Sequence, residues 1–99
     1  IYVRIDMTIP GAGSVIHLAE LAEIDEATCR MVRIIELDPA ETIRGAATQS
    51  TVAGMANKPN DVVPHPDSYT DFPDIESRPI DAEEFEGLWA EATTAFPEL

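Results

Sequence analysis

The chain lacks most of the residues that mark disulfide-bonded, metal-binding or nucleic-acid-binding proteins. Its 99 residues include one cysteine, two histidines and six basic residues against 19 acids. A single cysteine, Cys29, cannot form an internal disulfide, which excludes the small secreted domains that cystines stabilise. The shortage of Lys and Arg argues against a nucleic-acid binder, because clustered basic side chains must neutralise the phosphate backbone.

Long apolar runs are also missing. No stretch approaches the ~18 apolar residues that a membrane helix needs. The first residues lack the basic segment, apolar core and cleavage site of a signal peptide. The chain begins with Ile1 rather than Met, so missing leading residues or a removed leader stay open. We expect a cytoplasmic location.

The composition favours one folded domain. Hydrophobic residues make up 44% of the chain, which is enough for one packed core. A chain of this length has room for one small domain. We expect a single domain over 1–99, divided into a strand-rich part (1–49), a proline-rich loop region (50–79) and a C-terminal helix (80–96).

The first 25 residues predict a hairpin. Residues 1–9 alternate strictly between apolar and polar side chains, which is typical of a half-buried strand. Pro10–Gly13 then predicts a turn. Residues 15–25 are compatible with a helix or a strand, and we favour a strand because the first strand needs a partner. A β-bulge near Glu20 would keep the alternation regular.

Further strands are expected on both sides of a proline-rich segment. Residues 30–37 are apolar on both faces and predict a central strand, and Asp38–Glu41 predicts a type I turn. Residues 42–48 predict a weak fourth strand and residues 75–79 a fifth. Five prolines between 57 and 79 argue against a helix there. Three apolar side chains are expected to anchor this loop on the domain: Tyr69, Phe72 and Ile75.

The end of the chain predicts a capped helix. Asp81 is the expected N-cap, Glu84 completes a capping box, and Ile80 and Phe85 form a hydrophobic staple. An apolar stripe at helical spacing follows: Phe85, Leu88, Trp89, Ala92 and Phe96. We expect Trp89 to be a core residue. The fold class expected is α+β, with a four- to five-stranded antiparallel sheet and the helix packed on one face.

No arrangement of residues predicts catalysis or a cofactor. His17 and His65 have no second histidine or cysteine at metal-binding spacing, and Ser14 does not lie on a strand-to-helix turn. The acids around His65 do not follow the calcium-loop pattern. We therefore expect no catalytic residues, no metal and no cofactor. Three strand arginines are expected to neutralise nearby acids rather than form an anion site: Arg4, Arg33 and Arg44.

Negative charge accumulates toward the C-terminus. Residues 1–60 carry eight acids and five bases, whereas residues 61–99 carry eleven acids and one base. Solubility is the simpler explanation, and a basic protein partner is the more specific one. Six acidic residues are the predicted partner-binding positions: Asp67, Asp71, Asp74, Glu83, Glu86 and Glu91.

Two segments resemble a group of small uncharacterised bacterial domains. Ile80–Trp89, read as IDAEEFEGLW, looks like their acidic closing helix, and Val15–Thr48 is similar to their strand-rich part. The resemblance covers about two thirds of the chain and implies no known reaction. Small acidic proteins of this type also occur as immunity partners of bacterial toxins, which is an analogy of type.

We expect a small acidic protein-binding module, such as an immunity or inhibitor protein that masks a basic partner surface. The alternatives left open are a small ligand-binding or regulatory domain without catalysis, and a homodimer formed through a sheet edge. A small enzyme that uses the sheet and the long loop as a pocket is the weakest reading. No nucleic acid and no membrane are expected as partners.

Overall fold

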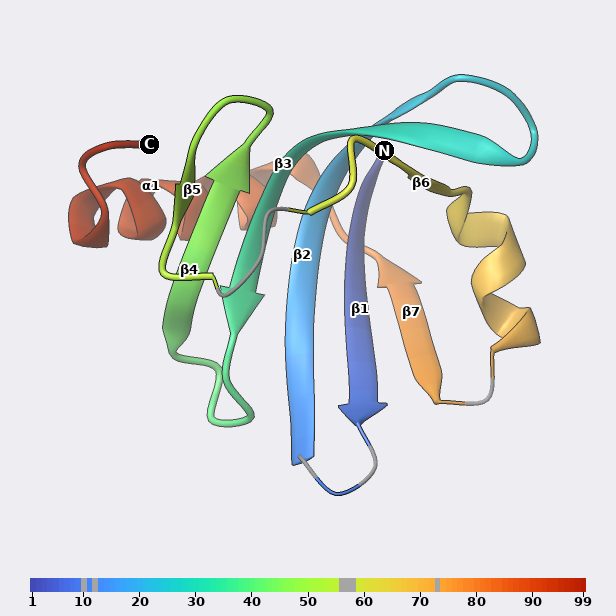
Figure 1. Cartoon of the computed structure of the whole chain (residues 1–99), viewed down its shortest axis with the longest axis horizontal. Coiled ribbons are helices and arrows are strands. Elements are labelled where there is room, and N and C mark those ends of the chain that lie inside the picture. The colour runs from blue at the N-terminus through green and yellow to red at the C-terminus, as the bar shows by residue number, and fades with distance from the viewer. Residues whose placement is uncertain (10, 12, 56–58, 73) are drawn as a thin grey trace.

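The computed structural model describes residues 1–9, 11, 13–55, 59–72 and 74–99, and these form one antiparallel sheet with a helix on one face (Figure 1). Seven strands appear in the described residues, in the path β5-β4-β3-β2-β1-β7, with β6 paired to β3. The strands are β1 (Tyr2–Ile9), β2 (Gly13–Glu23), β3 (Thr28–Leu37), β4 (Ile43–Thr48), β5 (Val52–Ala53), β6 (Val62–Pro64) and β7 (Ile75–Pro79). The α+β class is confirmed, but the expected number of strands was wrong.

The predicted hairpin of residues 1–25 is confirmed as β1 and β2. They pair without interruption from Tyr2↔Glu20 to Ile9↔Gly13. Part of the predicted Pro10–Gly13 turn lies outside the described residues. The central position predicted for residues 30–37 is also confirmed, because β3 pairs with β2, β4 and β6.

A β-bulge lies opposite Glu20, close to where the sequence predicts one. The β2–β3 register passes from Glu20↔Arg33 to Leu21↔Met31, so the extra residue is Val32 of β3 rather than a residue of β2. The alternation along β2 needs no correction because both of its faces are buried. The bulge instead reverses the faces of β3 on either side of Val32.

The sheet therefore has a hydrophobic core on each side. On the α1 side, buried strand residues pack with two buried helix residues: Ile16, Leu18, Ile35, Leu37, Ala46, Phe85 and Ala92. The opposite side holds a second buried cluster: Val3, Ala19, Leu21, Cys29, Met31, Ile34 and Ala47. A sheet buried on both faces explains why residues 15–25 and 30–37 do not alternate simply between apolar and polar.

The proline-rich region is more ordered than the sequence suggests. It contains β5, β6, β7 and a short 3₁₀ helix, η1 (Pro66–Asp71), so the expectation that prolines exclude a helix was wrong. Pro66 is tolerated because a first helical residue needs no N–H donor. Tyr69 is buried and Ile75 is half-buried, whereas Phe72 is 46% exposed. Two of the three expected apolar anchors therefore dock. Residues 75–79 form the predicted strand beside β1, and η1 lies next to its outer edge (Figure 1).

The C-terminal helix α1 spans Ala82–Ala95. The Asp81 side chain accepts a hydrogen bond from the Glu84 backbone N–H at 2.7 Å, which confirms the predicted N-cap. Phe85 is fully buried, whereas Trp89 packs against the same core and is only half-buried. Phe85 thus lies inside the core, whereas Trp89, which was also expected there, packs at its edge. No helix in the described ranges is long and apolar enough to cross a membrane.

Truncation of the two aromatic residues should separate their roles. Phe85→Ala is expected to lower the free energy of unfolding by ~3–5 kcal/mol, as for other buried aromatics. Trp89→Ala should cost less than this, because Trp89 is only half-buried at the edge of the same core. Urea denaturation of both variants measures the two losses. A larger loss for Trp89→Ala would show that Trp89, not Phe85, anchors α1.

Two glycine-to-alanine substitutions should change the stability of the protein in opposite directions. Gly87 lies on the exposed side of α1 with nothing within 4 Å of an added Cβ, so Gly87→Ala should stabilise the protein by about 0.5–1 kcal/mol. A Cβ at Gly45 would meet the Ala53 carbonyl oxygen at 2.7 Å, so Gly45→Ala should destabilise by ~1–3 kcal/mol. Thermal melts of the two variants give the comparison, and a stabilised Gly45→Ala protein would contradict the close approach of β4 and β5.

Candidate functional site

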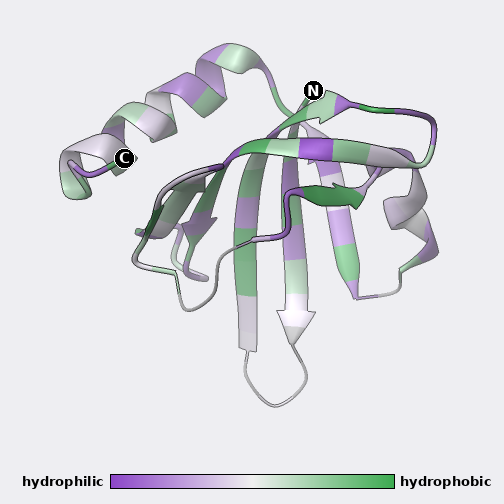
Figure 2. Cartoon of the chain, turned by 45° about the horizontal axis from the view of Figure 1, so that its top comes forward, coloured by the Kyte–Doolittle hydropathy of each residue, from purple (hydrophilic) through white to green (hydrophobic). Residues whose placement is uncertain are grey.

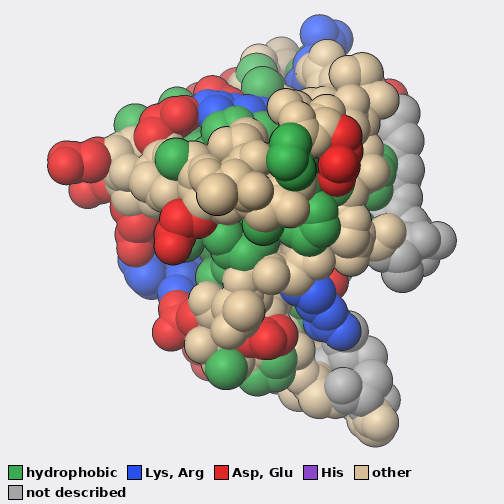
Figure 3. All heavy atoms as spheres, turned by 90° about the vertical axis from the view of Figure 1, so that its left-hand side faces the viewer, with side chains coloured by type: hydrophobic (Ala, Val, Ile, Leu, Met, Phe, Trp, Pro, Cys, Tyr) green, Lys and Arg blue, Asp and Glu red, His purple; other side chains and the backbone are tan. Residues whose placement is uncertain are grey.

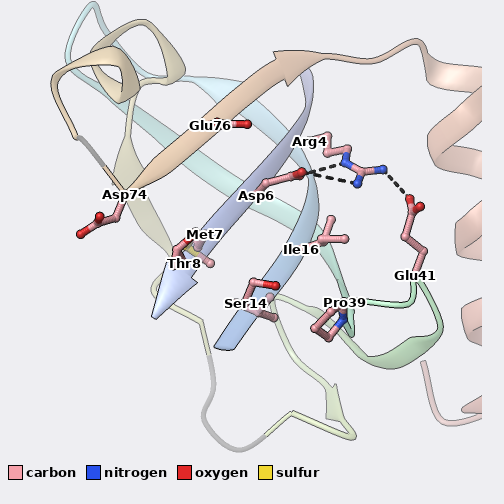
Figure 4. Close-up of a pocket in the computed structure, with 11 residues that line it drawn as sticks. Arg4, Asp6, Met7, Thr8, Ser14, Ile16, Pro39, Glu41, Asp74 and Glu76 are labelled. Atoms are coloured by element: carbon pink, nitrogen blue, oxygen red, sulfur yellow. Dashed lines mark hydrogen bonds and ion pairs between the residues drawn. The ribbon is translucent and has the colours of Figure 1, made fainter. Parts of the chain in front are cut away.

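A groove of about 450 Å³ opens on the α1 side of the sheet. The helix contacts β2, β3 and β4, and it leaves the adjoining parts of β1, β2 and β7 uncovered (Figure 4). Residues of β1, β2, the β3–β4 turn and β7 line the groove, together with the residue just before β7: Arg4, Asp6, Met7, Thr8, Ser14, Val15, Ile16, Pro39, Glu41, Asp74 and Glu76.

Strand register brings these side chains onto one face. Alternate residues of a strand point to the same side, so Arg4, Asp6 and Thr8 share the α1 side of β1. Asp6 lies directly opposite Ile16 of β2 and Glu76 of β7. The middle of the groove therefore places two carboxylates side by side on neighbouring strands.

Arg4 is the groove's cation, and two carboxylates already hold it. Its Nε lies 2.9 Å from Asp6 Oδ1 and its Nη1 lies 2.6 Å from Glu41 Oε1 (Figure 4). These hydrogen bonds raise the pKa of Arg4 above its already high value. The Arg4 side chain is 18% exposed, which makes it the floor of the groove rather than a projecting group.

The turn that carries Glu41 holds this residue in an unusual conformation. Glu41 has φ = 66°, in the left-handed region that glycine or asparagine normally occupies. Its N–H donates to the Asp38 carbonyl at 2.8 Å, and the Asp38 side chain accepts from Ala40 and Thr42, which confirms a β-turn over Asp38–Glu41. A non-glycine residue here costs ~1–2 kcal/mol, and the bond to Arg4 offsets part of that cost.

The remaining carboxylates give the groove a negative charge. Asp74 and Glu76 are exposed, and neither forms a salt bridge within the described residues. Four carboxylates against one arginine leave a formal charge of −3 in the groove. Like charges directly opposite each other, as at Asp6 and Glu76, destabilise a sheet. A cationic group placed between them would remove this repulsion.

The groove does not have the arrangement of a metal or nucleophile site. In the part of the chain that the structure describes, no three His, Cys, Asp or Glu side chains converge as metal ligands. His17 pairs with Glu36 and His65 with Glu23, each at 3.2 Å, and neither histidine lines the groove. Ser14 therefore has no imidazole beside it. The groove is suited to a cationic side chain rather than to a single ion.

Only one of the six predicted partner-binding acids lies in this groove. Asp74 lines it, whereas Asp67 and Asp71 are exposed on η1. The other three are exposed on α1 and project from a different part of the molecule: Glu83, Glu86 and Glu91. Figure 3, which faces the α1 and β5 side, shows acidic side chains scattered among other surfaces rather than gathered in one patch. The groove acids Asp6, Glu41 and Glu76 were missed.

Glu86 already forms an ion pair within the chain. Arg33 contacts Glu86, and its Nε lies 2.6 Å from Glu20 Oε1. The Arg33 guanidinium also lies 4.9 Å from the Phe85 ring centroid and 5.1 Å from that of Trp89. Arg33 thus fastens α1 to the sheet by ion pairs and cation–π contacts. With Arg4 at Asp6 and Arg44 3.6 Å from Glu36, the expectation that strand arginines neutralise nearby acids is confirmed.

The chain was compared with family models, curated proteins and solved structures, and none of them matches it. The resemblance of Ile80–Trp89 to the closing helix of small bacterial domains stays a prediction. What the protein does must be argued from its own groove and surface.

The Arg33–Glu86 pair should make stability depend on pH. The Arg33 hydrogen bond lowers the pKa of the Glu86 carboxyl, so the pair stabilises the fold above the unfolded-state pKa. This contribution is lost as the pH falls through the lowered folded-state pKa. Glu86→Gln should therefore be less stable than the parent protein at neutral pH, and the difference should be smaller at about pH 3, below the usual titration of Glu.

Glu91→Gln is the matched control, because Glu91 is exposed on the same helix and forms no salt bridge in the described residues. Thermal melts at both pH values measure the difference. Equal losses for the two variants at neutral pH would show that only the helix charge, not the pair, matters.

Proposed function

We propose that this protein is a small, non-catalytic binding module that receives a basic segment of a partner protein in the groove between β1, β2 and β7. One observation carries the proposal. Four carboxylates line the groove together with one arginine, Arg4, which Asp6 and Glu41 already hold. Such a module would act as an immunity or inhibitor protein does, by covering a basic working surface.

The chemistry of the groove favours arginine or lysine side chains. A cation near Asp74 and Glu76 would form charge-assisted hydrogen bonds, which are stronger than neutral ones. It would also reduce the repulsion between Asp6 and Glu76 across the β1–β7 ladder. Within the described residues, neither Asp74 nor Glu76 forms a salt bridge, although Arg78 lies two residues from Glu76 on β7.

The shape of the groove favours an extended segment. Its volume of about 450 Å³ lies within the ~300–1,000 Å³ range of ligand sites, yet it is open along the sheet rather than closed. Pro39 is exposed beside the largely buried Ile16 and offers apolar surface to the methylene stems of long basic side chains. A peptide strand can therefore place stems on these residues and charged ends on the carboxylates.

The acids outside the groove act at longer range. The chain has a net charge of −13, and the exposed predicted positions Asp67, Asp71, Glu83 and Glu91 contribute to its field. Complementary charge accelerates encounter, and this acceleration weakens once salt screens it over ~8 Å. In this proposal Asp74 contacts the partner, whereas these four acids steer it.

A synthetic peptide of alternating arginine and threonine, compared with its glutamine–threonine analogue, tests this function. We expect only the arginine peptide to bind, with an association rate that falls as salt rises. Replacing both free groove carboxylates, as Asp74→Asn with Glu76→Gln, should raise Kd about tenfold because the direct contacts are lost. Stopped-flow fluorescence gives the rates and titration calorimetry gives Kd.

The control removes the same charge elsewhere, as Asp67→Asn with Glu91→Gln. It should slow association slightly and change Kd less than ~2-fold, as expected for distant surface charges. Equal weakening by the two double variants would show that the negative charge acts only as a general field. The groove proposal would then be dropped.

A further inference from the structure

Arg30 differs from every other arginine of the chain. In the described ranges, four arginines form salt bridges: Arg4 with Asp6, Arg33 with Glu20, Arg44 with Glu36 and Arg78 with Glu84. Arg30, which is exposed on β3, forms none within those ranges. In a chain with 19 acids, an arginine on a strand that has no carboxylate partner is unexpected. Its surroundings explain the isolation.

Arg30 lies at the centre of an exposed apolar face. It pairs in register with Ala22 of β2 on one side and Val62 of β6 on the other, so the three side chains share a face. Ile24 and Val62 are each 50% exposed, and Ala22 and Pro64 are exposed as well. Figure 2, with the top of the molecule turned forward, shows β6 as a strongly hydrophobic strand beside this part of β3. We call these residues the β6 face: Ala22, Ile24, Arg30, Val62 and Pro64.

The β6 face is not simply a poorly packed strand end. Cys29, which alternates with Arg30, is fully buried, and Val63 packs against the same core. This part of the sheet therefore has one face buried against the core and the other face exposed to solvent. Single exposed apolar residues are ordinary, but four that gather around one arginine, on β2, the turn after it and β6, are typical of an interaction surface.

We propose that the β6 face is the interface between two copies of this chain. The argument is charge complementarity. Glu26 lies exposed in the β2–β3 turn at the end of this face and has no hydrogen bond or salt bridge in the described residues. The carboxylate of its neighbour Asp25 instead accepts hydrogen bonds within the turn, from the backbone N–H groups of Ala27 and Thr28. A two-fold axis through the face brings Glu26 of each copy toward Arg30 of the other.

A second copy can form a larger contact through the β6 face than by pairing with a strand at the β7 or β5 edge of the sheet. The outer edge of β7 has η1 beside it, and β5 at the other end of the sheet is only two residues long (Figure 1). The face instead supplies apolar surface from both copies and two ion pairs. This inference does not depend on the groove, which is formed by the opposite ends of β1 and β2.

Sedimentation equilibrium of the full chain tests the interface. We expect a monomer–dimer equilibrium that shifts toward dimer as salt rises, because salt screens the repulsion between two copies of charge −13. Val62→Asp should weaken the dimer at least ~10-fold, since it places a charge in the apolar contact. A chain that stays monomeric up to about millimolar concentration, the range of weak contacts, would overturn the proposal.

Charge reversal gives the sharper test. Glu26→Arg lowers the net negative charge, so general repulsion predicts a tighter dimer, whereas the proposed pair with Arg30 predicts a weaker one. The double variant Arg30→Glu with Glu26→Arg should restore the parent dissociation constant. Arg44→Glu, which makes the same charge change as Arg30→Glu at an exposed site on β4, should have less effect.

Circular dichroism confirms that each variant is folded. A tighter dimer in Glu26→Arg, no recovery in the double variant, or equal effects of Arg30→Glu and Arg44→Glu would each refute the paired interface. Because none of these substitutions lies in the groove, Kd for the arginine peptide should change only slightly, as for other distant surface charges. Failure of the dimer and failure of the groove are therefore separate results.

Discussion

The extra residue Val32 in β3 is the constraint on which the surfaces of this molecule depend. Beyond it, Ile35 and Leu37 face α1, whereas before it Cys29 and Met31 face the opposite core. Without the bulge, strict alternation would place Arg30 on the same side as the buried Ile34. The bulge moves Arg30 to the exposed face and leaves Arg33 on the α1 side, where it contacts Glu20 and Glu86. One inserted residue thus places both Arg30 and Arg33 on the α1 side of the sheet, away from the opposite core.

The sequence predicts the parts of this fold that have regular periodicity. The alternation of residues 1–9 and the Asp81 cap with its helical apolar stripe are local signals, and both elements form as expected. β5 and β6 have two and three residues, too few to show alternation, and prolines surround β6. The sequence also does not show which aromatic residue of the helical apolar stripe is more deeply buried. Phe85 and Trp89 have equivalent spacing, and only the position of α1 over β2–β4 decides which is enclosed.

The sequence indicates one carboxylate of the groove, Asp74, but not the other three. Asp6 could be placed on the polar side of its strand from alternation alone. Its neighbour Glu76 is 70 residues away in sequence, and only the β1–β7 register places the two side by side. Glu41 reaches Arg4 because its backbone adopts a positive φ, for which a glutamate gives no sequence signal. Counting acids toward the C-terminus instead selected α1 positions, one of which is already bound to Arg33.

The two proposed surfaces lie at opposite ends of the same strand. Ser14 of the groove and Ala22 of the β6 face are eight residues apart on β2, which corresponds to about 26 Å along an extended strand. Both surfaces lie on the same side of the sheet, so two chains joined through the β6 face would keep each groove about this distance along β2 from the contact. A partner that carries two basic segments could then occupy both grooves, and the second binding event would become intramolecular. Single grooves that bind weakly and depend on salt would in this way give a tight complex, without any closer fit at either groove.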